Sequence, residues 1–337
     1  MNKTASLRRW CAALLVLLAA ACAQAPVRRQ EVRIASGGVV LAGTVVAPAD
    51  GGRHPAVLLL HGSGPDGREN PYYDMLADAF VGRGFAVLIY DKRGSHASGG
   101  DWRLSPFGAL IDDAAAAAGV LRRHPWVDSA RVGVWGGSEG AVIAPEVALR
   151  ERLAFVIMQS ATGVTFAEQN LHQTAGQVQA LASEERRAAM HLQRLKHAYA
   201  RTGAGWEEYE AAARSAAGRP YSGLAGLTDR NDWWWAWYRT KMDYTPVPAL
   251  ERLRAPVLAV WGGADALVPV ERSRAAVAAA RRAIDNPGDS LVIIPGADHV
   301  VQVQGLRGVL RRGLRNRPLH LGLMVRWAER QVSVPPP

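Results

Sequence analysis

Residues 131–146 read RVGVWGGSEGAVIAPE, and this stretch decides the fold. Its first five residues carry valines at alternate positions and predict a short buried strand, while the apolar residues from Ala141 onward predict a helix. The G-x-S-x-G pattern centred on Ser138 lies between them, in a strand–turn–helix setting. Side chains at Gly136 and Gly140 would collide with the neighbouring strand and helix, which explains both glycines. The turn leaves the Ser138 hydroxyl exposed at a helix N-terminus, where developing negative charge is favoured. The stretch therefore predicts a nucleophilic serine.

This pattern in this setting resembles the α/β-hydrolases. More narrowly, it resembles the bacterial serine esterase and dienelactone-hydrolase-like branch, which is related to the catalytic domains of prolyl-oligopeptidase-type peptidases. The resemblance implies an α/β fold with a mostly parallel central sheet, flanked by helices and interrupted by an inserted helical cap. We expect the core to comprise residues 29–162 and 251–333, and the cap residues 163–250.

Several short apolar runs fit the buried strands of such a sheet. They occupy residues 55–60, 85–90, 154–159, 256–261 and 291–294. Two alternating segments within residues 31–48 fit the antiparallel pair that opens the sheet in this family.

Two further side chains follow predicted strands and complete a catalytic set with Ser138. Asp265 follows the run at 256–261, where the family carries its orienting carboxylate, and His299 follows the last strand. Nucleophile, acid and base in this chain order are typical of α/β-hydrolases. Each lies after the carboxyl end of a separate strand, where α/β sheets build their sites. Asp298 is a poor rival for the acid because adjacent side chains diverge.

The turn His61-Gly62-Ser63-Gly64 follows the strand at 55–60 and resembles the HG-x-G turn of esterases and lipases. The resemblance implies an oxyanion hole made by the backbone N–H groups of Ser63 and Glu139. The Glu139 side chain is unusual beside a nucleophile that generates an anion. It is either turned away into a polar contact or available to bind a cationic group of the substrate.

Residues 163–250 are rich in Ala, Arg and Glu and predict helices, as expected for a cap. An aromatic run at 232–238 contains Trp234 and Trp237, which are candidates for lining an acyl pocket. Packing of the same rings within the cap is an equally good explanation, since a helix that is aromatic all round must be buried against something.

The N-terminus predicts a targeting segment. Basic residues precede a short apolar run, and small residues follow it, so residues 1–21 are expected to be a signal peptide. Ala-Ala-Cys at its end resembles a lipoprotein cleavage site, which would leave Cys22 lipidated and anchor the protein to a membrane. Ordinary cleavage after residue 23 is the alternative. Either way we expect an exported bacterial protein, periplasmic or membrane-anchored.

Other classes of partner are not indicated. The formal net charge is +10, but no helix combines a basic cluster with interleaved aromatic residues, so nucleic acid is not expected. The sequence has no H-E-x-x-H motif or cysteine pair for a metal, and no G-x-G-x-x-G for a dinucleotide, so no cofactor is expected. No obligate protein partner is inferred.

The residues together favour a serine hydrolase that cleaves small-molecule carboxylic esters of small to medium acyl groups through an acyl-enzyme. The main alternative is a serine peptidase of the same fold, either an aminopeptidase, which would need cap acids to hold an α-amino group, or a prolyl-peptidase relative. A lipase and a non-enzymatic binding protein are further alternatives. The complete Ser-Asp-His set argues against the last.

Overall fold

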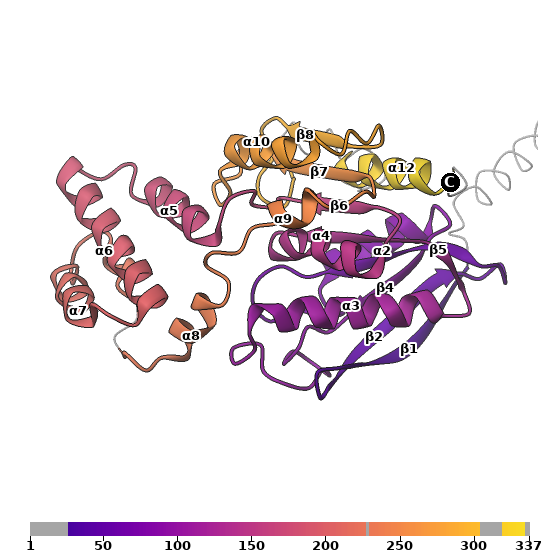
Figure 1. Cartoon of the computed structure of the whole chain (residues 1–337), viewed down its shortest axis with the longest axis horizontal. Coiled ribbons are helices and arrows are strands. Elements are labelled where there is room, and N and C mark those ends of the chain that lie inside the picture. Colours follow the sequence, from indigo (N-terminus) through magenta and orange to yellow (C-terminus); the bar gives the residue numbers. More distant parts are fainter. Residues whose placement is uncertain (1–25, 227–228, 304–318, 334–337) are drawn as a thin grey trace, which may run out of the picture.

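Strands of the described residues form one mixed sheet at the centre of the molecule (Figure 1). The computed structural model describes residues 26–226, 229–303 and 319–333, so the predicted signal peptide and Cys22 lie outside the described residues. The strand order is β1-β2-β4-β3-β5-β6-β7-β8. The strands are β1 (Val27–Ser36), β2 (Val39–Pro48), β3 (His54–Leu60), β4 (Ala86–Tyr90), β5 (Val127–Gly137), β6 (Val156–Gln159), β7 (Val257–Gly262) and β8 (Ser290–Ile294).

Strands β1 and β2 pair antiparallel, and β2 pairs antiparallel with β4. All pairs from β4 to β8 are parallel. The predicted mostly parallel sheet with an antiparallel opening pair is therefore confirmed. Two strands are longer than the sequence pattern indicated. β1 begins at Val27, not at residue 31, and β5 begins at Val127, because Val127 pairs with His54 ahead of the apolar run.

Helices cover both faces of the sheet. Alternate residues of β3 divide between two cores: Leu58 and Leu60 face one, and Val57 and Leu59 face the other. Helices α3 (Phe107–Arg123), α4 (Glu139–Glu151) and α10 (Val270–Arg281) contribute to the first core. Helices α2 (Pro71–Val81) and α12 (Leu319–Ser333) contribute to the second. The runs read as buried strands are apolar throughout because both of their faces are covered.

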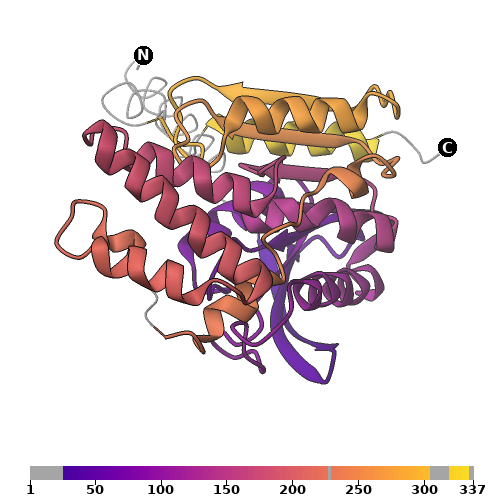
Figure 2. The ribbon, with the colours of Figure 1, turned by 60° about the vertical axis from the view of Figure 1, so that its left-hand side comes forward.

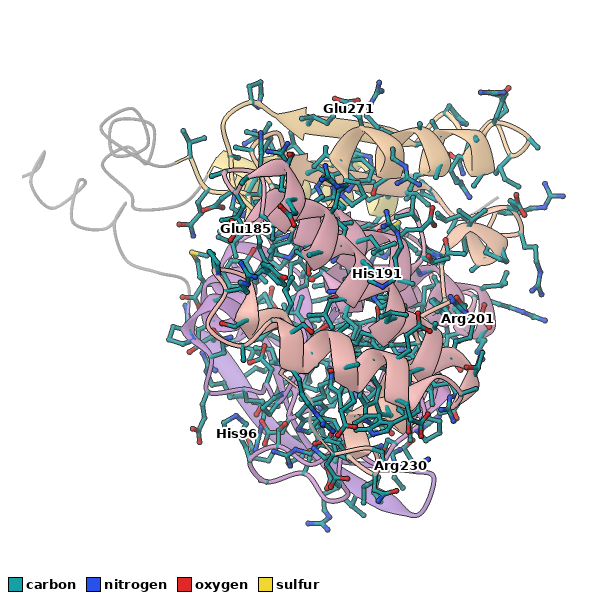
Figure 3. The ribbon with its side chains drawn as sticks, turned by 90° about the vertical axis from the view of Figure 1, so that its left-hand side faces the viewer. His96, Glu185, His191, Arg201, Arg230 and Glu271 are labelled. Atoms are coloured by element: carbon teal, nitrogen blue, oxygen red, sulfur yellow. The ribbon has the colours of Figure 1, made fainter. Side chains whose placement is uncertain are left out.

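A group of helices between β6 and β7 forms the predicted insertion, at one end of the molecule beyond the sheet (Figures 1 and 2). They are α5 (Phe166–Gln177), α6 (Ser183–Thr202), α7 (Trp206–Ser215), the 3₁₀ helix η1 (Ser222–Leu224), α8 (Trp233–Arg239) and α9 (Val247–Leu250). The insertion has its own core, which includes the fully buried side chains of Leu192, Tyr209 and Met242. Glu185, His191 and Arg201 lie on the outer side of α6 (Figure 3).

The cap contacts the core through defined side chains. Trp102, in the loop before α3, meets Trp233 and Trp237 of α8 at ring-centroid distances of 5.4 and 5.6 Å. Glu168 of α5 forms an ion pair with Arg272 of α10 at 2.6 Å. Among the described helices, none combines the length and the apolar character needed to cross a membrane.

Candidate active site

Ser138 lies between β5 and α4 with φ +53° and ψ −115°, a backbone conformation that a residue with a side chain rarely adopts. The flanking glycines permit this turn. A Cβ atom on Gly136 would lie 2.3 Å from the backbone of Gly140, and a Cβ on Gly140 would lie 2.6 Å from the carbonyl oxygens of Leu60 and His61. The serine is therefore held above the sheet by close backbone contacts that only glycine allows.

The structure brings Ser138, His299 and Asp265 together. His299 Nε2 lies 3.1 Å from Ser138 Oγ, and His299 Nδ1 lies 2.8 Å from Asp265 Oδ2. The Asp265 side chain has no exposed surface, whereas one fifth of the His299 side chain is accessible. Both are hydrogen-bond distances. They link serine to imidazole and imidazole to carboxylate, which allows the imidazole to take a proton from the serine while the carboxylate orients the imidazole ring.

The two partners of the serine are themselves held in place. Asp265 Oδ1 accepts the backbone N–H groups of Leu267 and Val268 at 2.8 and 3.1 Å, so its other oxygen is directed at the imidazole. Ser160 Oγ donates to the His299 carbonyl oxygen at 2.7 Å and ties the histidine loop to the end of β6. Asp298, the rival acid, instead accepts N–H groups of its own loop.

The two backbone groups predicted to form an oxyanion hole belong to turns beside the serine. A Cβ atom on Gly62 would lie 3.8 Å from Ser138 Cβ, so the turn that carries Ser63 runs next to the nucleophile. Within the described part of the chain, the N–H groups of Ser63 and Glu139 donate to no other group. The His61 ring anchors this turn, since it is buried edge-on between Tyr73 and Tyr90, and burial lowers its pKa to about 4.

The Glu139 side chain is turned into the protein, 1% exposed, between two lysines. Its oxygens accept Lys92 Nζ at 2.6 Å and Lys241 Nζ at 2.9 Å, and Ser63 Oγ donates to it at 3.1 Å. Burial alone would raise the pKa of this carboxyl, but the two ammonium groups lower it to about 2. Glu139 is thus in a polar contact, the first of the two alternatives, and its oxygens are already occupied by cations of the protein.

The two tryptophans considered for the acyl pocket have different surroundings. Trp234 stacks on Tyr238 with centroids 4.4 Å apart and the planes 15° apart, within the cap. Trp237 lies under the ammonium group of Lys241, 3.7 Å from its ring centroid. The same ammonium group binds Glu139, the residue after the nucleophile, so Trp237 is linked to the site through Lys241. Contact of Trp234 or Trp237 with a substrate stays a prediction.

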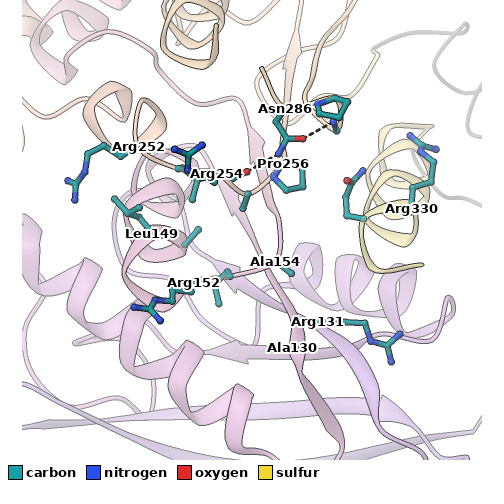
Figure 4. A pocket seen from close by; sticks show the side chains of 17 residues that line it. Ala130, Arg131, Leu149, Arg152, Ala154, Arg252, Arg254, Pro256, Asn286 and Arg330 are labelled. Atoms are coloured by element: carbon teal, nitrogen blue, oxygen red, sulfur yellow. Dashed lines mark hydrogen bonds between the residues drawn. The ribbon is translucent and has the colours of Figure 1, made fainter. Parts of the chain in front are cut away.

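A cavity of about 760 Å³ lies away from this site (Figure 4). Arg131 lines it from the first half of β5, and Ala154 and Pro256 line it just before β6 and β7 begin. The candidate catalytic residues follow the opposite, carboxyl ends of the strands. The position of this cavity therefore excludes it as the site where Ser138 would meet a substrate.

Comparison with known proteins agrees with this geometry. Residues 37–300 match the family described as X-Pro dipeptidyl-peptidase (S15 family). The chain belongs to this family, a branch of the α/β-hydrolases whose relatives here include esterases.

Curated relatives include esterase EstD of Thermotoga maritima, 33% identical over 123 residues, which are 35% of this chain and 29% of EstD. The chain thus matches less than a third of the length of EstD. An uncharacterized Mycobacterium tuberculosis protein, Rv2307c, is 26% identical over 81% of this chain and 73% of its own length. Among solved structures, the Pyrococcus furiosus esterase Pf2001 covers 90% of this chain and 91% of its own, with a TM-score of 0.57 and 17% identity. The likeness to Pf2001 shows the fold.

Sequence reasoning missed the two lysines that hold Glu139. Lys92 stands in Asp91-Lys92-Arg93-Gly94, a turn that resembles the D-x-R-G turn of the family. Its neighbours have structural partners, because Asp91 accepts Arg68 and Arg93 forms a bidentate pair with Asp113. Lys241 is 102 residues from Glu139 and follows α8 in the cap, and nothing in its local sequence indicates a buried partner.

Proposed function

We propose that the protein is a serine hydrolase that cleaves carboxylic esters of small to medium acyl groups. The observation that carries the proposal is the hydrogen-bonded series Ser138–His299–Asp265 on a strained strand–turn–helix reversal. The esterase names of EstD and Pf2001 support an ester substrate.

In the proposed reaction, Ser138 Oγ attacks the acyl carbonyl carbon while His299 Nε2 takes its proton. Asp265 keeps the other imidazole nitrogen protonated and stabilises the imidazolium. The carbonyl oxygen becomes an oxyanion, and the N–H groups of Ser63 and Glu139 are proposed to bind it. His299 then returns the proton to the leaving alcohol, and water repeats the sequence on the acyl-enzyme to release the acid.

A peptidase of the same mechanism is the second candidate, because the matching family model is named for an X-Pro dipeptidyl-peptidase. Such an exopeptidase needs a carboxylate for the α-amino group of its substrate. Glu139, the acid next to the nucleophile, has both oxygens bound by lysines. In the cap, Glu184, Glu207 and Glu208 are exposed to solvent, Glu185 lies on the outer side of α6 (Figure 3), and Glu210 pairs with Arg214 at 2.7 Å. The binding of Glu139 by two lysines and the outward position of the cap acids favour the ester substrate.

The proposal is tested with the purified protein and its Ser138→Ala variant, assayed on p-nitrophenyl esters from acetate to decanoate and on alanyl-prolyl and prolyl p-nitroanilides. Turnover of esters that is lost in the variant supports the esterase, and the chain-length profile measures the acyl pocket. Turnover of the anilides alone would support the peptidase. Failure of a fluorophosphonate to label Ser138 would contradict both. Export and lipidation at Cys22 remain proposals from the sequence.

A further inference from the structure

A buried ionic cluster lies directly behind the proposed oxyanion hole. It consists of the Glu139 carboxylate and the ammonium groups of Lys92 and Lys241, and the hydroxyl of the exposed residue Ser63 joins it by a hydrogen bond to Glu139. The exposed fractions of the three charged residues are 1%, 5% and 4%. The reaction proposed above uses none of these side chains.

Such a cluster is a poor device for stability alone. Each buried ion loses its hydration, and replacing buried ion pairs by apolar residues is often neutral or stabilising. Two ammonium groups and one carboxylate also leave an excess of positive charge in the interior. Burial lowers the pKa of Lys241, and only its contacts with Glu139 oppose this. The cluster therefore calls for a role beyond stability.

Every bond of the cluster reaches a residue of the two turns that carry the proposed oxyanion donors. Lys92 Nζ donates to Glu139 Oε1 and also to the carbonyl oxygen of Gly62 at 2.8 Å, so it bridges both turns. Ser63 Oγ donates to Glu139 Oε2, which joins the two donor residues to each other. A carbonyl held at Gly62 fixes the plane of the peptide whose N–H belongs to Ser63.

The remaining bond comes from the cap. Lys241 Nζ donates to Glu139 Oε2 at 2.9 Å while it lies 3.7 Å from the ring centroid of Trp237 and 5.1 Å from that of Phe166. Both aromatic rings belong to cap helices, α8 and α5. The Lys241 ammonium group is thus held by aromatic rings of the cap and forms its ion pair with Glu139 of the core.

We propose that Glu139, Lys92 and Lys241 are positioning residues that hold the Ser63 and Glu139 N–H groups in the geometry of the oxyanion hole, and that Lys241 makes this geometry depend on the docked cap. The inference rests on the proposed function. It assigns the Glu139 side chain a role through its own backbone, which lies one residue from the nucleophile. The substrate touches the N–H groups, and the cluster keeps them pointed at the developing charge.

The test compares Lys241→Met with Lys196→Met. Lys196 is the control because it is another cap lysine over a tryptophan, half-buried and 4.8 Å from the Trp234 centroid, and it does not contact Glu139. Four quantities are measured for each purified protein: kcat and KM on p-nitrophenyl butyrate, the Ki of a trifluoromethyl ketone, and Tm. The ketone forms a tetrahedral adduct whose oxyanion occupies the hole, so its Ki reports the geometry of the hole directly.

Because a misplaced donor or a displacement of about 1 Å costs roughly 10²-fold in rate, Lys241→Met is expected to lower kcat by about 10²-fold with KM little changed. The Ki of the ketone should rise by the same factor. Lys196→Met should change neither quantity by more than about threefold. Ser63→Ala, which removes one bond of the cluster and keeps the backbone N–H, should give a smaller, parallel loss in both and serves if Lys241→Met does not fold.

Unchanged kcat and Ki in Lys241→Met or Ser63→Ala, with only Tm lowered, would show that the cluster is structural and would overturn the inference while leaving the proposed function intact. A loss of kcat without a rise in Ki would also overturn it. Failure of the proposed function would instead appear in the wild-type protein, as absent ester turnover and absent fluorophosphonate labelling. That result would contradict both the proposed function and this inference.

Discussion

Replacing Asp265 by asparagine tests the catalytic set with a change of one atom. In the structure, Asp265 Oδ1 accepts two backbone N–H groups, from Leu267 and Val268, and Oδ2 faces His299 Nδ1 at 2.8 Å. An asparagine fits the same space. Its oxygen must take the Oδ1 position, because only an acceptor satisfies the two N–H groups, so its NH₂ group faces the imidazole.

The orientation of this amide sets the size of the effect. An NH₂ donor requires Nδ1 to be an acceptor, which places the imidazole proton on Nε2, facing Ser138 Oγ, where a base is needed. Turning the amide round would leave two buried N–H groups unpaired, at about 1–3 kcal/mol each. At the lower limit the turned form is about one molecule in 30. We therefore expect kcat to fall at least about 30-fold, and by about 10⁴-fold at the upper limit of about 3 kcal/mol for each N–H group, a loss of the size seen in other triads.

The assay is steady-state hydrolysis of a p-nitrophenyl ester by Asp265→Asn, with Tm measured in parallel. Asp298→Asn is the matched control, since its oxygen can still accept the N–H groups of Val300 and Gln302 and its kcat should stay within a few-fold of wild type. Retention of more than a thirtieth of the wild-type kcat by Asp265→Asn would refute the reasoning. So would an equal loss in Asp298→Asn.

Three further predictions follow from single sites. Gly140→Ala places a Cβ atom 2.6 Å from backbone carbonyls and should lower both Tm and kcat. Gly108→Ala is the control, because its Cβ meets nothing within 4 Å, and it should raise the free energy of unfolding by about 0.4–1 kcal/mol. Thermal melts and ester assays of both variants check this. The pKa of Glu139 falls from 4.5 to about 2 on folding, so its stabilisation is complete above about pH 4.5 and is lost as the pH falls towards 2. Urea unfolding at pH 5.5 and pH 3 should show wild type losing about 2 kcal/mol more than Glu139→Gln, and an equal loss would contradict the pKa. Arg281 is 4% exposed and donates to carbonyl oxygens before β7 and to Asp289. Arg281→Met should therefore lower the free energy of unfolding in urea by about 3–5 kcal/mol without changing kcat of the folded protein. A change below about 1 kcal/mol would show that the hydrogen bonds of Arg281 contribute little.

Much of the fold was predictable because it depends on local pattern. Apolar runs of four to six residues indicated the parallel strands, and the structure places strands at each of them. Helix α2 was not predicted, although Asn70 caps it and Pro71 occupies its first turn, a signal that the sequence does contain. The lengths of β1 and β5 were underestimated, since their outer halves are stabilised by pairing and carry little apolar pattern.

The sequence by itself determined the strand–turn–helix reversal at Ser138, because the two glycines and the flanking apolar runs are local requirements of backbone geometry. It also determined that Ser138, Asp265 and His299 meet, because each follows a parallel strand and parallel strands direct their carboxyl ends to one edge of the sheet. Tertiary structure alone decided the surroundings of Glu139. Its partners Lys92 and Lys241 come from separate elements, and a buried charge is recognised only by what lies within hydrogen-bond distance of it.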